Sequence, residues 1–258
     1  MSRRFTSVLI GGVLPALLAL LWEFAARRGG AASYAFTPIG QIADSFVTML
    51  QNGMLLGDLW ASLRRTLLAL LIGGGSGLLL GTALGIFRPL SIGVSPLINI
   101  FRQVPILGWL PLIALWLGNG DGARLLLVSL AAFYPTVLNT QKGFDAADRK
   151  LIEAGMLYQF SRWQRVRFIA LPSALPLIFT GISQALSFAW IATIGVELLF
   201  SASAGLGTEM VNAQVSARTD IIMICILCVG VMGFLLNHGL MLTRNHLLRW
   251  HRSALGEG

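Results

Sequence analysis

The segment NTQKGFDAADRKLIEAGMLYQFSRWQRVRF, residues 139–168, separates two long apolar regions of the chain. Its mixed charge requires that it lie in water rather than in a lipid bilayer. Apolar residues nevertheless recur in it at helical spacing and predict one apolar helix face: Leu151, Ile152, Met156, Leu157, Phe160 and Trp163. We expect Pro172 to end this helix, because a new apolar run begins there. A short amphipathic helix between two apolar regions is suited to docking against another protein.

The composition is that of an integral membrane protein. The 258 residues are 55% hydrophobic and 12% charged, and the mean hydropathy is +0.75, whereas a soluble domain has about 25% charged residues. We predict an all-α fold with six transmembrane helices, a count that five or seven would also fit, over about residues 7–26, 62–87, 93–118, 122–141, 172–200 and 221–243. The third contains Pro96, Pro105 and Pro111, and we expect it to be broken or kinked.

The chain is predicted to form one membrane domain without a separate soluble domain. Residues 1–57 would hold the first transmembrane helix and an external connection, with a short helix around Ile39–Leu50. Residues 58–245 would form the transmembrane core, and residues 246–258 a cytoplasmic tail.

The formal net charge of +8 is arranged as in a membrane protein, which argues against nucleic acid as a partner. If the N-terminus is cytoplasmic, twelve of the 19 lysines and arginines lie inside. This excess predicts that both termini and residues 139–171 are cytoplasmic. The twelve are Arg3, Arg4, Arg88, Lys142, Arg149, Lys150, Arg162, Arg165, Arg167, Arg244, Arg249 and Arg252. Arg102 falls within a span, and the others fall outside or at the outer interface: Arg27, Arg28, Arg64, Arg65, Arg124 and Arg218.

Three other patterns are interpreted as structural. A cleaved signal peptide is not expected, because Glu23 and two arginines occupy the place of a cleavage site. Cys225 and Cys228 lie in an apolar span without neighbouring ligands, so we expect packing residues and no metal. The run GGGSGLLLGTALG, residues 73–85, lacks the Lys-Ser/Thr of a phosphate-binding loop, so this chain is not expected to hydrolyse ATP.

Glycine recurs every fourth residue in the second predicted span, at Gly73, Gly77, Gly81 and Gly85. Such a ridge of small residues lets another helix approach closely. Packing within one subunit is favoured over packing at a subunit interface.

The polar segment resembles the EAA loop of permeases of binding-protein-dependent ABC importers. That pattern reads Glu-Ala-Ala, three residues, Gly, nine residues, Ile, one residue and Leu-Pro. Gly155 stands in place of the second alanine and Gln159 in place of the glycine, where Gln159 must adopt a helical or strained conformation. The remaining positions match, at Glu153, Ala154, Ile169, Leu171 and Pro172.

The resemblance extends over about residues 36–245. FRQVPILGWLPLIALWLGNGDGARLLLVSLAAFYPTVLNT, residues 101–140, is similar to the third and fourth spans of the taurine, nitrate, aliphatic-sulfonate and bicarbonate permease group. LPSALPLIFTGISQALSFAW and GVELLFSASAGLG, residues 171–190 and 195–207, are similar to its fifth span and outer loop.

The resemblance implies a type I ABC importer permease with a cytoplasmic coupling helix, in a bacterial inner membrane. Two ATPase subunits would bind ATP and Mg²⁺, while this chain would bind no cofactor. An extracytoplasmic binding protein and a second permease copy, as a homodimer, would complete the assembly. The residues at the positions of the EAA pattern, Gly155 and Gln159 included, would contact the ATPase together with Arg162 and Trp163.

Polar residues within spans are candidates for the solute pathway. Arg102 and Gln103 lie in the proline-broken span, where a guanidinium suits an oxyanion such as sulfonate or nitrate. Arg102 would otherwise pair with Glu197 or lie at the cytoplasmic interface. The further candidates are Asn139, Gln184, Ser187 and Glu197, although such residues also serve structural roles.

A secondary transporter or channel is the main alternative, and it predicts inverted repeats, none of which is evident. A membrane enzyme would need clustered catalytic groups, which the histidines near the C-terminal end lack: His238, His246 and His251.

Overall fold

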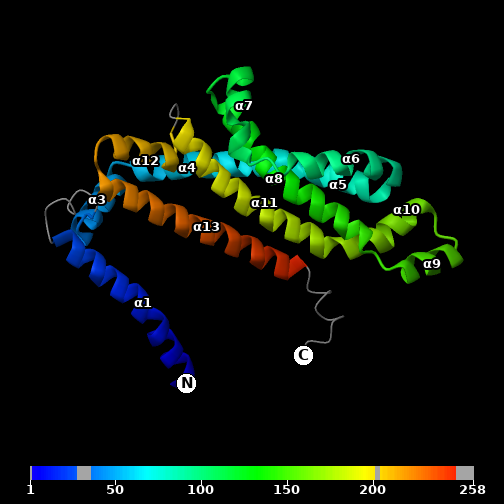
Figure 1. Ribbon diagram of the computed structural model, residues 1–258. Coiled ribbons are helices and arrows are strands. Elements are labelled where there is room, and N and C mark those ends of the chain that lie inside the picture. Colours follow the sequence, from blue (N-terminus) through cyan, green and yellow to red (C-terminus); the bar gives the residue numbers. More distant parts are fainter. Residues whose placement is uncertain (1, 28–35, 201–203, 248–258) are drawn as a thin grey trace.

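The computed structural model describes residues 2–27, 36–200 and 204–247 of the chain. Within these residues every regular element is a helix, and the long helices pack into a bundle from which α1 (Ser2–Arg27) extends (Figure 1). The bundle contains α8 (Asp121–Asp145), α11 (Leu171–Leu199), α13 (Thr219–Leu247) and the continuous run of α4 (Met54–Ala69), η1 (Leu70–Gly74) and α5 (Gly75–Ile86). The all-α prediction is confirmed.

Several helices are long and apolar enough to cross a membrane. Four described runs qualify, Met54–Ile86, Asp121–Asp145, Arg162–Leu199 and Thr219–His246, and a bent pair of helices is a fifth candidate. The first predicted span lies within α1, and α3 (Ile39–Gln51) is the short helix expected in the external connection. The chain is therefore a multi-pass membrane protein.

The core of the bundle is built where α8 packs against α11 and against the η1–α5 run. The largest buried cluster has small side chains at this contact, including Ala123 and Ala132 of α8 and Ala185 and Ala189 of α11. Short side chains let helices approach closely and pack well. Such packing stabilises helix association in a bilayer, where the hydrophobic effect does not contribute because the lipid tails are themselves apolar.

The glycine ridge, formed by Gly73, Gly77, Gly81 and Gly85, faces α8. A β-carbon added at Gly73 would lie 1.9 Å from the carbonyl oxygen of Ser129, and one at Gly85 would lie 2.4 Å from Cβ of Phe144. The middle two glycines are nearly as close, with nearest α8 atoms at 2.8 and 2.7 Å. The ridge is used within one chain, to bring two helix backbones together.

The bent pair consists of α6 (Arg88–Phe101) and the helix formed by η2 (Ile106–Trp109) and α7 (Leu110–Leu117), which meet at 90°. The N–H of Arg102 still bonds to the Ile98 carbonyl at 3.0 Å, but Pro105 follows with φ −54° and ψ 136°. Proline supplies no N–H and disfavours a helical residue before it. The predicted break is confirmed. Arg102 lies at the end of α6, and α7 turns away from the bundle (Figure 1).

Candidate functional site

The polar segment begins with α9 (Arg149–Leu157), whose first turn is capped by Asp148. The Asp148 carboxylate accepts the N–H of Lys150 at 2.9 Å, which satisfies a free donor at a helix start. Four of the six residues of the predicted apolar face keep between 53% and 85% of their surface exposed: Leu151, Met156, Leu157 and Trp163. Apolar side chains gathered on a water-facing segment form a surface suited to a protein partner.

A Schellman turn ends α9. The N–H of Phe160 donates to the Gly155 carbonyl at 2.8 Å, and the N–H of Gln159 donates to the Met156 carbonyl at 2.9 Å. Gln159 has φ 58°, the left-handed conformation in which this turn usually carries glycine. The EAA pattern has its glycine at this position, so the turn is kept here with glutamine at the cost of backbone strain.

The prediction that one helix carries the whole apolar face and ends at Pro172 is wrong. A new helix, α10 (Arg162–Arg165), begins after Ser161 because of a capping box: the Ser161 hydroxyl accepts the Gln164 N–H at 3.2 Å, and the Gln164 side chain accepts the Ser161 N–H at 2.7 Å. The chain then stays helical through Pro172 to the end of α11.

Pro172 is tolerated because a π-helical turn, η3 (Val166–Ala170), precedes it. In this turn the N–H of Leu171 reaches back five residues to the Val166 carbonyl. The wider turn relieves the clash that a proline ring makes with the preceding turn of an α-helix.

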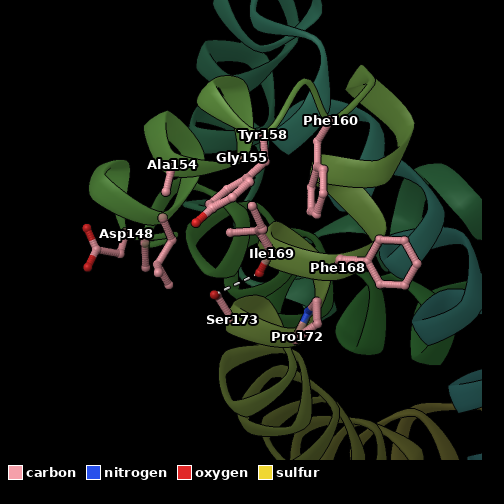
Figure 2. A pocket seen from close by; sticks show the side chains of 11 residues that line it. Asp148, Ala154, Gly155, Tyr158, Phe160, Phe168, Ile169, Pro172 and Ser173 are labelled. Atoms are coloured by element: carbon pink, nitrogen blue, oxygen red, sulfur yellow. Dashed lines mark hydrogen bonds between the residues drawn. The ribbon is translucent and has the colours of Figure 1, made fainter.

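A hollow of about 610 Å³ lies between α9 and the start of α11, and we call it the coupling hollow (Figure 2). Four residues of the EAA-like pattern line it, Ala154, Gly155, Ile169 and Pro172, together with the rings of Tyr158 and Phe160. A β-carbon on Gly155 would lie 2.9 Å from Cδ1 of Ile169, so the missing side chain lets Ile169 pack against α9.

The other predicted coupling residues, Gln159 among them, do not line this hollow. Glu153, Arg162 and Trp163 are exposed, and Leu171 is 38% exposed. The segment therefore offers charged and aromatic side chains to the surroundings of the bundle.

The second candidate site is a cavity of about 750 Å³, bounded by residues 102–107 and by one face each of α8 and α11. Four of the six predicted pathway residues line it: Arg102, Gln103, Asn139 and Gln184. The Asn139 side chain donates a hydrogen bond to Oε1 of Gln184 at 2.9 Å and so joins α8 to α11.

Lys142 also lines this cavity and was not among the predicted residues. Its position three residues after Asn139 places both on one face of a helix, which was the available signal. The charge count had instead assigned Lys142 only to the cytoplasmic side.

Ser187 and Glu197 do not line the cavity. The Ser187 hydroxyl donates to the Ser183 carbonyl at 3.1 Å, an ordinary bond for serine within a helix. Glu197 is fully buried and pairs with Arg65 of α4, so the alternative in which Arg102 pairs with Glu197 is wrong.

The buried carboxylate of Glu197 joins three helices. Besides Arg65, it accepts the hydroxyl of Ser62 at 2.8 Å and the N–H of Gly207 at 3.0 Å. Gly207 lies in the first turn of α12 (Leu206–Val215), and Ser62 also lies on α4. A charge at this depth is tolerated because it is paired and hydrogen-bonded.

Cys225 is buried in an apolar cluster with Leu206 and Ile224, and Cys228 packs against the same cluster. In the part of the chain that the structure describes, no three His, Cys, Asp or Glu side chains gather as metal ligands.

A profile of the family described as "Binding-protein-dependent transport system inner membrane component" matches residues 73–252. This chain belongs to that family. The match includes the glycine ridge, the cavity residues and the whole EAA-like segment, and the membrane subunits of such systems are permeases. The permease prediction is confirmed over a secondary transporter or a channel.

Several named relatives are similar over most of the permease. The putative aliphatic sulfonates transport permease protein SsuC of Bacillus subtilis (strain 168) is 31% identical over 246 residues, which cover 95% of this chain and 89% of the relative. The taurine transport system permease protein TauC of Escherichia coli (strain K12) is 31% identical over 256 residues, covering 97% and 92%. The nitrate import permease protein NrtB of Leptolyngbya laminosa is 27% identical over 222 residues, covering 84% and 79%.

Solved structures share the fold. A crystal structure of an amino acid ABC transporter with histidines has a TM-score of 0.66 at 19% identity and covers 78% of this chain and 98% of the other. An inward-facing structure of the MetNI methionine ABC transporter has a TM-score of 0.55 at 20% identity, covering 72% and 94%. The predicted type I importer permease fold is confirmed.

Proposed function

We propose that this permease forms the solute pathway of an ABC importer that works by alternating access, driven by two separate ATPase subunits. ATP and Mg²⁺ bind to those subunits, and this chain contributes no catalytic residue. The observation that supports the proposal is the exposed apolar face of α9 beside the coupling hollow.

The connections of α9 suit it to transmit force. Only residues 146–148 separate it from α8, and the turn at Tyr158–Ser161 joins it to the helix that continues as α11. Gly155 and Ile169 add a direct contact between α9 and η3. A partner that moves α9 therefore moves both helices that bound the cavity. In this reading Glu153, Arg162 and Trp163 contact the ATPase.

The assembly contains two copies of this chain, because each chain has one EAA-like segment and two ATPases need two docking sites. A binding protein delivers the solute to the outer side of a bacterial inner membrane. The excess of lysine and arginine on one side supports an orientation with both termini in the cytoplasm.

The cargo is a small anion. Support comes from Arg102, Gln103, Asn139 and Gln184 in the cavity lining and from relatives named for transport of sulfonates, taurine and nitrate.

Charge reversal at Glu153 tests the docking role. Glu153→Lys should release the ATPase and lower uptake about tenfold or more, since like charges across an interface cost several kcal/mol. Copurification of the ATPase with the tagged permease and uptake into vesicles are the measurements. Asp44→Lys, the same reversal on exposed α3, is the matched control. Normal copurification and uptake with Glu153→Lys would show that α9 is not the docking element.

Cysteine labelling tests the orientation. A cysteine at Ser161, with Cys225 and Cys228 first replaced, should resist a membrane-impermeant reagent in intact cells and react in inverted vesicles. Labelling in intact cells would reverse the proposed orientation.

A further inference from the structure

An apolar groove of about 520 Å³ lies between α3, α4 and α13. In Figure 1, α3 lies beside the start of α13. Among the described residues the lining is entirely apolar, with four residues from α3, one from α4 and six from α13. The six on α13 extend from Ile224 to Leu235. Leu227 is 58% and Val231 59% exposed, so the groove is open to the surroundings of the bundle.

The position of the groove along α13 matches one leaflet of a bilayer. The apolar run Thr219–His246 has 28 residues and is about 42 Å long, close to the 40–45 Å of a bilayer with its headgroup regions. Ile224 lies about 7.5 Å and Leu235 about 24 Å from the start of this run, whose midpoint is at about 21 Å. The groove therefore begins near the edge of the hydrocarbon core and ends just past the midplane.

The helix α3 marks the membrane surface at this end of the groove. Its polar residues Gln41 and Asp44 are exposed, whereas Ile42 packs against an apolar cluster that includes residues of α13. A helix with one polar and one apolar face is suited to lie in a membrane surface. The Ser45 hydroxyl donates to Oδ2 of Asp220 at 2.6 Å, which fixes α3 to the first turn of α13 just before the groove begins.

The groove is too narrow to enclose a helix. Spread over the length of about 16 Å between Ile224 and Leu235, its volume of 520 Å³ corresponds to a width of about 6 Å. A helix with its side chains is about 10–12 Å wide, and a transmembrane helix of a second copy would also cross both leaflets. A single hydrocarbon chain fits both the width and the length. The apolar lining offers no partner to a polar ligand, which would lose its hydrogen bonds there.

We propose that the groove binds one acyl chain of a phospholipid in the leaflet on the side of α3, which is the outer leaflet in the proposed orientation. The chain enters beside α3, follows α13 to the level of Leu235 and packs against both helices. It extends into the membrane the contact that the Ser45–Asp220 hydrogen bond makes at the surface. Because lipid tails are themselves apolar, the affinity comes from the close fit of the chain in the groove. This inference does not depend on the proposed function.

The test is native mass spectrometry of the full-length permease, extracted in detergent from vesicles of phosphatidylethanolamine and phosphatidylglycerol. One phospholipid should stay bound to each chain. Ala43→Trp places a large ring in the groove and should lose this lipid, and Ala43 is exposed, so the ring does not enter the core. Val47→Trp is the matched control, because Val47 lies one turn further along α3, is 49% exposed and does not line the groove.

A second pair of variants fills the groove from the other wall. Val231→Trp on α13 should also lose the lipid, whereas Phe234→Trp, at a position that is 67% exposed and outside the lining, should retain it. This pair keeps the test decisive if Ala43→Trp does not fold.

Photolabelling locates the chain. A phospholipid with a photoreactive group in the middle of its acyl chain should label Leu227 and Val231 in the groove. Ile226 and Phe234 lie at similar depths on α13 outside the lining and should be labelled less, although both are exposed.

Three kinds of result would overturn the inference. Equal loss of lipid from Ala43→Trp and Val47→Trp, or equal labelling inside and outside the groove, would show lipid that only surrounds the protein. Retention of the lipid in both Ala43→Trp and Val231→Trp would place it elsewhere. A natural chain that retains no lipid would leave the groove without its proposed ligand, and a dimer that dissociates in Ala43→Trp would then assign the groove to a second copy.

Discussion

Replacing Gln159 with glycine should stabilise the turn that separates α9 from α10. Gln159 has φ 58°, and a side chain in this left-handed conformation costs about 1–2 kcal/mol, which glycine avoids. Glycine also gives the unfolded chain more conformational freedom, which reduces this gain in stability by about 0.4–1 kcal/mol. Gln159 is exposed, so its side chain takes little packing with it. The net gain is about 1 kcal/mol, roughly a fivefold shift of the local opening equilibrium.

Hydrogen exchange measures this shift at the bonds that define the turn. The N–H of Phe160, which donates to the Gly155 carbonyl at 2.8 Å, should exchange about fivefold more slowly in Gln159→Gly. In Gln159→Val it should exchange faster than in the natural chain, because a β-branched residue is strained further at positive φ.

A second turn of the same kind supplies the control. Ala217 has φ 53°, and the N–H of Arg218 donates to the Ala213 carbonyl at 2.8 Å. Ala217→Gly should slow exchange at Arg218 and leave Phe160 unaffected. If Gln159→Gly does not slow exchange at Phe160, or if Gln159→Val slows it equally, the strain at this position is refuted.

Two further predictions concern buried positions. Gly73→Ala should lower the unfolding free energy by about 1–3 kcal/mol, because its β-carbon would meet the Ser129 carbonyl at 1.9 Å, whereas Gly75→Ala meets nothing within 4 Å and should not destabilise. Thermal unfolding in detergent compares the two, and equal midpoints would argue against the tight contact. Burial raises the pKa of Glu209, against the opposing effect of a hydrogen bond with Asn212. Its charge therefore costs stability as pH rises above the unfolded value of about 4.3. Glu209→Gln should raise the midpoint at neutral pH, with the gain vanishing below about pH 4, and a gain that does not depend on pH would contradict this origin.

Much of the fold follows from local sequence patterns. Apolar runs predicted the long helices, and Pro105 predicted the break that leaves Arg102 at the end of α6. The limits of the coupling segment were missed although a signal existed, because Ser161 and Gln164 have the spacing of a capping box. The prediction that Pro172 ends the helix failed because the π-helical turn before it removes the steric clash that proline usually makes within a helix. That turn has no clear signal in the sequence.

Single residues of the candidate sites could be predicted from the sequence, but their pairing across helices could not. Asn139 and Gln184 are polar residues in apolar spans, so each could be found alone. Arg65 and Glu197 are 132 positions apart, and only the packing of α4 against α11 shows that they form a pair. Lys142 was missed because charge counting places a lysine on one side of the membrane without regard to the helix face it occupies.

The glycine ridge also limits how α5 and α8 can move. With β-carbons excluded at Gly73 and Gly85 by contacts of 1.9 and 2.4 Å, the run of η1 and α5 has no clearance from α8. A roll of α5 about its own axis by one residue position is about 100°, and it would drive leucine side chains into a space too small for a methyl group. The contact thus fixes the rotation of α5 relative to α8. A displacement of α8 that is caused by α9 should therefore move α5 with it as one rigid body. The conformational change that opens and closes the pathway must then take place at other helix contacts.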